Sequence, residues 1–293
     1  MMAAPHRAAP LTSRGGRRAA LAGRRAWLPI AIPAATLFIA FWLLPMAKLA
    51  GLGAATPQGM ESSAYWLVVT QPRYWQSLAN TVALSLGATL ATLAIALPVS
   101  RFLARHPHFP GRRALMALLL FPLAFPGVVV GFLVILTTGR QGVLNTLSRA
   151  LTGEPTVLAY GMAGLFIGYL YFLLPRTIGV LMAAVEGIDK QWLEAAQTLG
   201  ARPWRRFVDI ELPALSSALT AAGAMCFATA MGAFGTVFTL GTRIDVLPIT
   251  IYDEFTHYAN IPVAAALSVV LGLATWAVLY AANAFAGRAA HGR

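Results

Sequence analysis

The sequence predicts an all-α polytopic membrane protein with six transmembrane helices. Apolar residues make up 58% of its 293 residues and charged residues only 11%, whereas soluble domains carry about 25% charged residues. Six apolar stretches are long enough for the roughly 20-residue crossing of a bilayer core. The basic residues gather in alternate links between these stretches, as cytoplasmic loops do. The composition excludes a soluble enzyme and the disordered, collagen-like and disulfide-based classes.

The six predicted spans are rich in Ala, Leu, Val and Gly. They are, in order, Trp27–Ala50, Thr81–Phe102, Ala114–Thr138, Val157–Ile178, Ala214–Thr236 and Ile261–Ala286. We place no Asp, Glu, His, Lys or Arg in the middle of any of them. Proton-driven carriers usually need such a residue at depth, so the pattern argues against one.

The basic residues set the predicted orientation. They are concentrated in the amino tail, in the links after spans two and four, and at the carboxyl end, whereas acidic residues show no such bias. Those after span two are Arg101, Arg105, Arg112 and Arg113; those assigned to the link after span four are Arg176, Lys190, Arg202, Arg205 and Arg206. The positive-inside rule therefore places both termini in the cytoplasm. On this interpretation the net charge of +12 reflects topology, and no nucleic-acid partner is expected.

Motifs for catalysis and for metal or nucleotide binding are missing. The sequence has no GxxxxGK[ST] loop, HExxH, GxSxG or paired CxxC, so we expect no catalytic residue, metal or cofactor. His106 and His108 flank Pro107 and are interpreted as a solvated turn. Cys226 is the single cysteine and cannot form an internal disulfide.

One cytoplasmic segment is long and polar for this chain: VEGIDKQWLEAAQTLGARPWRRFVDIELP, residues 185–213. It predicts two short helices around a turn. Gly187 and Asp189 can open the first helix, and Gly200 suits the positive φ of a helix end. Pro203 fits the first turn of the second helix, and Pro213 precedes span five.

Apolar and aromatic residues of this segment, Trp192, Leu199 and Trp204 among them, are expected outside the membrane. Such a surface usually docks a partner. An amphipathic loop on membrane lipid, with its arginines on headgroup phosphates, is the alternative.

Glu194-Ala195-Ala196, followed at fixed spacing by Gly200, Ile210 and Leu212-Pro213, resembles the EAA loop of permease subunits of binding-protein-dependent type I ABC importers. The resemblance covers about residues 74–286 and implies the MetI-like permease fold. It further implies two cytoplasmic ABC ATPase subunits, a second permease chain that is identical or different, and a periplasmic solute-binding protein. In that family the EAA loop docks on the ATPase, so the quoted residues would shape and anchor the docking element.

The resemblance also gives a domain division. We expect a basic disordered tail over 1–26 and the first transmembrane helix with a periplasmic segment over 27–73. The permease domain would cover 74–286, with its coupling loop at 186–213, and a cytoplasmic tail would cover 287–293.

Helix-breaking and small residues mark a candidate translocation path. Pro122 and Pro126 each remove a hydrogen bond from span three, which favours a pore-lining or hinge position or a kinked packing helix. Thr229, Gly232, Gly235 and Thr236 at the end of span five could line a passage or allow close helix packing.

The solute is predicted from the segment after span five. Asp245, Asp253 and Glu254 could form a mouth that attracts a cation, or they could be ordinary solvated charges. Spans two and three, together with Ile244–Phe255, resemble permeases of the spermidine/putrescine group, so a polyamine or similar small organic cation is expected. Transport of 2-aminoethylphosphonate, ferric iron, thiamine or sulfate is the alternative within the class. An ATP-independent channel or facilitator is the alternative outside it.

Overall fold

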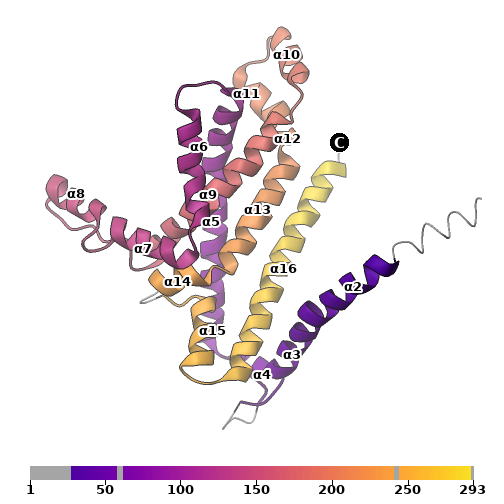
Figure 1. Cartoon of the computed structure of the whole chain (residues 1–293), viewed down its shortest axis with the longest axis vertical. Helices are drawn as coiled ribbons and strands as arrows, with labels where there is room; N and C mark the ends of the chain where they lie inside the picture. The colour runs from indigo at the N-terminus through magenta and orange to yellow at the C-terminus, as the bar shows by residue number, and fades with distance from the viewer. Residues whose placement is uncertain (1–27, 58–61, 241–243, 292–293) are drawn as a thin grey trace, which may run out of the picture. The chain divides into compact units, whose positions relative to one another are not determined.

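A computed structural model describes residues 28–57, 62–240 and 244–291, and every regular element in those ranges is a helix (Figure 1). The all-α prediction is therefore confirmed. The chain divides into one unit that ends at Gly51 and a second that begins at Leu52. The predicted tail 1–26 lies outside the described residues, as do 292–293 at the carboxyl end.

The first unit is a single apolar helical segment. α2 (Leu28–Phe38), a π-helical turn (Ile39–Leu43) and α3 (Leu44–Gly53, which reaches into the second unit) follow one another without a break. Large apolar side chains such as Phe41, 79% exposed, and Trp42, 54% exposed, cover its surface. A helix of this kind is suited to hydrocarbon and agrees with the first predicted span.

The second unit contains the other helices. They are α4 (Ala64–Thr70), α5 (Pro72–Arg105), α6 (Arg112–Leu120), a 3-10 turn (Phe121–Ala124), α7 (Gly127–Thr138), α8 (Val143–Thr152), α9 (Met162–Glu186), α10 (Lys190–Thr198), α11 (Pro203–Arg206), a π-helical turn (Phe207–Glu211), α12 (Leu212–Ala214), α13 (Ser216–Met231), α14 (Phe234–Leu240), α15 (Leu247–Thr256) and α16 (Ile261–His291).

The long helices α5, α9 and α13 form the centre of the second unit. Leu84 of α5, Tyr169 of α9 and Cys226 of α13 belong to one buried cluster. A second cluster joins α4, α15 and α16 and contains Leu247 and Leu267. α7 and α8 run sideways from this bundle (Figure 1).

Small hydroxyl residues also fasten α5 to α15. The backbone N–H of Leu247 donates to Thr81 Oγ1 at 2.8 Å, and Thr250 Oγ1 donates to Ser77 Oγ at 3.1 Å. All of these residues are buried. Polar contacts of this kind join helices where water is absent.

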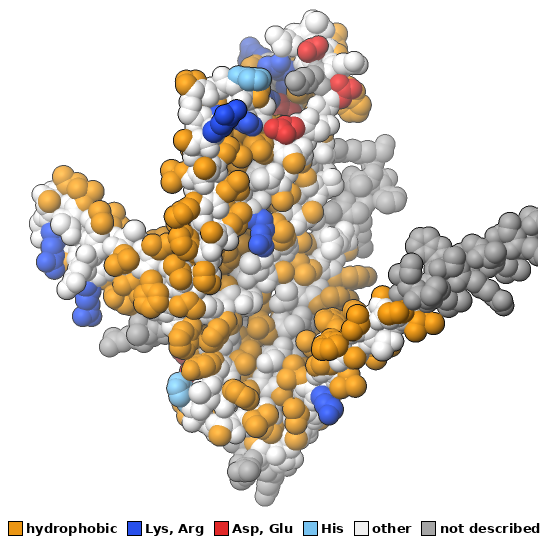
Figure 2. All heavy atoms as spheres, viewed as in Figure 1, with side chains coloured by type: hydrophobic (Ala, Val, Ile, Leu, Met, Phe, Trp, Pro, Cys, Tyr) orange, Lys and Arg blue, Asp and Glu red, His pale blue; other side chains and the backbone are white. Residues whose placement is uncertain are grey.

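One end of the second unit gathers the segments predicted to be cytoplasmic. The end of α5, the start of α6, α10, α11 and the end of α16 lie there (Figure 1). Figure 2 shows acidic and basic side chains at this end and hydrophobic side chains over the face below it. The membrane orientation itself remains a prediction from the charge distribution.

Five helical stretches are long and apolar enough to cross a membrane, and a bent pair, 203–214 with 216–231, makes a sixth if it is one span. These numbers agree with the predicted count. The third candidate, however, covers 127–152, and the predicted third span, Ala114–Thr138, is interrupted at residues 121–126, where its two prolines predict a break or kink. Phe125 has extended backbone (φ −96°, ψ 133°), because the residue before a proline is pushed out of the α region.

The fifth predicted span, Ala214–Thr236, is also interrupted. Its axis bends by 65° between Ala214 and Ser216, and α13 ends at Met231 before Gly232. The chain resumes as the separate helix α14 at Phe234. Two broken helices therefore contribute to the same bundle.

Candidate functional site

The EAA segment, residues 186–213, forms the predicted helix, turn and helix. Asp189 caps α10 by accepting a hydrogen bond from the backbone N–H of Gln191 at 2.9 Å. Gly200 follows α10 with φ +76°, a conformation that glycine adopts without strain. The N–H of Ala201 donates to the carbonyl of Ala196 at 3.0 Å, which completes a standard helix end.

The EAA segment carries exposed apolar groups on α10, on the turn that follows it and on α11. Trp192 is 65% exposed, Leu199 87% and Trp204 71%. Glu194 and Ala195 are also exposed, while Ala196 is half-buried. Exposed aromatic and aliphatic groups on a polar helix are a typical docking surface.

Ile210, Leu212 and Pro213 lie where the EAA segment joins α13, and all three are half-buried. The stretch from Pro203 to Ala214 is helical throughout, because its π-helical turn links α11 directly to α12. Pro213 lies within that helical stretch and the bend follows it. The segment therefore reaches the fifth span without a flexible linker.

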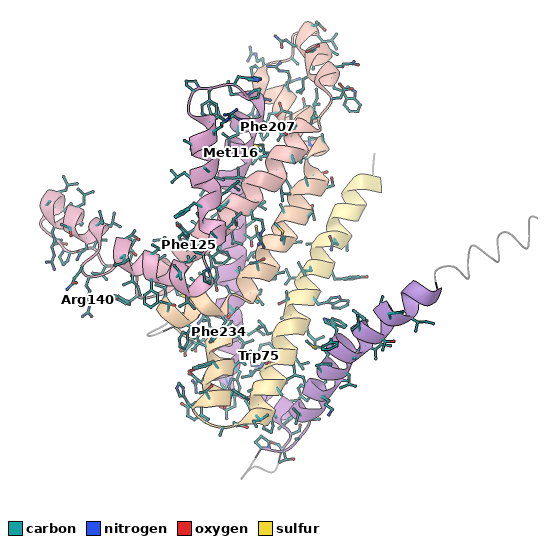
Figure 3. The ribbon with its side chains drawn as sticks, in the orientation of Figure 1. Trp75, Met116, Phe125, Arg140, Phe207 and Phe234 are labelled. Atoms are coloured by element: carbon teal, nitrogen blue, oxygen red, sulfur yellow. The ribbon has the colours of Figure 1, made fainter. Side chains whose placement is uncertain are left out.

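A buried ion cluster attaches the EAA segment to α5. Glu211 has a side chain only 3% exposed, and its carboxylate accepts from Arg101 Nε at 2.8 Å and from Arg105 Nη2. The Arg101 guanidinium also lies 4.0 Å from the centre of the Phe207 ring. Figure 3 shows Phe207 near the end of the bundle that carries α10 and α11. We call Arg101, Arg105, Phe207 and Glu211 the α5 clamp.

The α5 clamp was not predicted from the sequence. Glu211 and Arg101 are 110 positions apart, so no local spacing joins them. The available signal was Glu211 itself, which lies between the apolar residues Ile210 and Leu212. An acid buried by such neighbours needs a partner.

The six residues proposed for the path line one cavity of about 500 Å³. Pro122 and Pro126 come from the break between α6 and α7, and Thr229, Gly232, Gly235 and Thr236 come from the break between α13 and α14. Phe125 and Phe234 also line it, and Figure 3 shows both where α7 leaves the bundle. The structure thus brings together residues more than 90 positions apart in the sequence.

Close packing holds one wall of the cavity. Thr236 is 1% exposed and its hydroxyl donates to the carbonyl of Gly127 at 3.1 Å. The Thr239 hydroxyl lies 3.3 Å from the carbonyl of Val128 and 3.0 Å from that of Gly235 in its own helix, so its one proton is shared between them. A Cβ added at Gly131 would lie 2.5 Å from the Cβ of Thr239. Small residues of these helices therefore line the cavity and allow the helices to approach closely, while their role in a passage stays a prediction.

Arg176 also lines this cavity. Its assignment to the cytoplasmic link is wrong, because α9 continues to Glu186 and Arg176 lies inside the helix. The statement that no charged residue stands in the middle of a span is corrected with it. Arg176 lies near the carboxyl end of the predicted fourth span, Val157–Ile178, and was grouped with the basic residues that follow it, whereas α9 extends eight residues beyond Ile178.

The three carboxylates of the predicted mouth have different surroundings. Glu254 is buried, 5% exposed, and accepts a hydrogen bond from the Tyr74 hydroxyl at 2.9 Å. Asp253 contacts His257 Nδ1 at 3.0 Å, and Asp245 is exposed. Glu254 is therefore turned into the fold and is not available to a solute at an opening.

The family comparison finds a match over residues 96–290 to the model described as the inner membrane component of binding-protein-dependent transport systems. The chain belongs to this family. It is thus a multi-pass protein of the inner membrane and a transport component rather than an enzyme.

Two curated relatives and one solved structure illustrate the similarity. A thiamine transport system permease protein of Escherichia coli (strain K12) is 30% identical over 79% of this chain, and the chain spans only 42% of that protein's length. A protein of Salmonella choleraesuis (strain SC-B67), named for 2-aminoethylphosphonate transport, is 30% identical over 84% of this chain and 93% of its own length. A bacterial alginate ABC transporter, crystallised in complex with an alginate pentasaccharide-bound periplasmic protein, matches 90% of this chain and 96% of its own chain at a TM-score of 0.77 and 18% identity. This last similarity confirms the MetI-like permease fold.

Proposed function

We propose that the chain is the permease subunit of an ATP-driven importer that couples to a separate ATPase through the EAA segment. The observation that carries the proposal is the exposure of Trp192 on α10 and Leu199 just after it, in a segment that the α5 clamp holds to α5 at Phe207 and Glu211. The sequence has no nucleotide-binding loop of its own, so ATP hydrolysis would belong to two partner ATPase subunits.

A second permease chain and a periplasmic solute-binding protein complete the proposed importer. The cavity is partly open to the outside of this chain, and a second permease chain would supply the other half of the route across the membrane. The name of the family itself specifies dependence on a binding protein. An ATP-independent channel or facilitator is the competing function, and the docking experiment below separates the two.

The docking experiment is a site-directed crosslink from α10. Cys226 is replaced by Ser, which can keep the hydrogen bond to Thr177 (Sγ–Oγ1 3.0 Å), and Leu199→Cys is introduced. We expect a short thiol crosslinker to join Leu199→Cys to the ATPase subunit in membranes. Leu151→Cys on α8, 76% exposed, is the matched control and should give no such product. Labelling of Leu199→Cys without any ATPase crosslink, together with solute uptake that survives loss of the ATPase, would favour the channel.

For the solute, the names of the relatives suggest which molecules to test first. They specify thiamine and 2-aminoethylphosphonate, both of which are alternatives that the sequence left open. The spermidine/putrescine prediction has no counterpart among the relatives reported above. We infer a small organic solute that a binding protein delivers, and the cavity described above is where this chain would contact it.

A further inference from the structure

Arg176 lies well inside the length of α9. It follows Met162, the first residue of α9, by 14 positions and precedes Glu186, the last, by 10 positions. At about 1.5 Å per residue, it lies roughly 15 Å along the helix from the end at which the other basic residues gather. The side chain is exposed, and it reaches the cavity that Phe125 and Phe234 line.

Among the described residues that line the cavity, Arg176 is the one ionisable residue. The other polar side chains in the lining are Thr229 and Thr236, whose hydroxyls already donate to the carbonyls of Met225 and Gly127. Across the described residues, the ion pairs involve Glu211 and Asp253 and none of them includes Arg176. The guanidinium of Arg176 is thus the hydrogen-bond donor that a solute in this cavity would meet.

A lone arginine at this depth is costly without a counter-ion, and ionisable residues inside membrane spans usually mark a solute or ion pathway. A guanidinium binds phosphonate, phosphate or carboxylate groups through two parallel hydrogen bonds. A cavity of about 500 Å³ is in the size range of small-molecule sites.

We propose that Arg176 selects for a solute with an anionic group, such as a phosphonate or carboxylate, and disfavours a polycation in this cavity. The proposal rests on the proposed import function and names the substrate class. It favours 2-aminoethylphosphonate over putrescine, which has no anionic group. The counter-charge of Arg176 could instead come from an acidic side chain of the second permease chain. The first experiment distinguishes that case from an anionic solute.

The first experiment measures the charge of the cavity without knowledge of the solute. Thr229→Cys is introduced in the Cys226→Ser background, in membranes that hold the complete transporter. The rates of modification by a sulfonate-bearing and a trimethylammonium-bearing methanethiosulfonate are then compared. Any effect of Arg176 on the reactivity of the thiol is common to both reagents, so their rate ratio reports the local potential.

We expect the anionic reagent to be favoured, and Arg176→Gln to lower the rate ratio roughly five-fold at low ionic strength, for charges about 8 Å apart in water. Arg149→Gln, which removes an exposed arginine of α8, should leave the ratio unchanged. A ratio that does not respond to Arg176→Gln would overturn the proposal, because it would mean that a protein carboxylate already neutralises the guanidinium. Lack of modification by either reagent would overturn it as well.

The second experiment uses uptake into proteoliposomes that contain the complete importer with its binding protein. 2-Aminoethylphosphonate, thiamine and putrescine are supplied separately. We expect uptake of the anionic solute, a loss of ten-fold or more in Arg176→Gln and substantial recovery in Arg176→Lys. Uptake of putrescine in preference to 2-aminoethylphosphonate would refute the substrate class while leaving the import function intact. Absence of any ATP-dependent uptake would instead count against the proposed function, and the reagent rates would still test Arg176.

Discussion

The α5 clamp allows a quantitative prediction about how the EAA segment is held. Arg101→Gln and Glu211→Gln are made singly and together, so that the double-mutant cycle isolates their interaction. Glu211 is 3% exposed and Arg101 is 21% exposed. A hydrogen bond to a charged group contributes about 1.5–3 kcal/mol, so we expect a coupling energy of about 1–3 kcal/mol. Arg101→Gln should cost more than this coupling, because it also removes the contact with the Phe207 ring.

The assay is reversible denaturation of the purified permease in detergent, read by the fluorescence of its tryptophans and combined with binding-protein-stimulated ATP hydrolysis by the complete importer. Arg105→Gln is the matched control. Its side chain is 48% exposed, and solvent screening should reduce its coupling to Glu211 below about 1 kcal/mol. Stability losses of Arg101→Gln and Glu211→Gln that simply add would refute the clamp. Unchanged stimulation in variants with the expected coupling would show that the clamp stabilises the fold without transmitting force.

Three further predictions follow from single contacts. Gly200→Val forces a β-branched residue to φ +76° and should cost about 1–3 kcal/mol locally. Solute-stimulated ATP hydrolysis should therefore fall in Gly200→Val, while Gly200→Asn keeps most of it. Equal activity of the two variants would contradict the need for this turn. Gly131→Ala places a Cβ 2.5 Å from the Cβ of Thr239 and should lower thermal stability by about 1–3 kcal/mol, whereas Gly179→Ala, where an added Cβ meets nothing within 4 Å, should not. A neutral Gly131→Ala variant would show that α7 and α14 can separate. Tyr74→Phe removes the hydrogen-bond donor of the buried Glu254 and should cost about 1–3 kcal/mol, whereas Tyr74→Phe combined with Glu254→Leu should recover part of the loss in the same denaturation assay.

Local signals in the sequence predicted the fold class and the EAA segment well. The start of α10 at Asp189, the turn at Gly200 and the second helix at Pro203 are each set by one residue with a strong conformational preference. Pro122 and Pro126 likewise indicated where span three breaks, whereas the break at Gly232 in span five was not predicted. Their meeting in one cavity agrees with the path prediction, whose functional role stays a proposal.

Contacts between distant segments could not be predicted in this way. Glu254 looks like a free carboxylate in the sequence, and only the fold brings Tyr74, 180 positions earlier, against it. Arg176 was grouped with the cytoplasmic link because it lies near the end of the predicted fourth span, but α9 continues past it to Glu186 although Pro175 lies inside the helix. The packing around α9 tolerates that proline, and a single sequence does not reveal how neighbouring helices accommodate a missing hydrogen bond.

The two hydroxyl bonds between α14 and α7 limit how the cavity can change shape. Thr236 and Thr239 both hold carbonyls of the first turn of α7, and Gly131 lets the two helices touch. Sliding either helix alone would lose both contacts at once, so we expect α7 and α14 to move together. If the cavity is the proposed path, its opening would then displace the two helices as one unit.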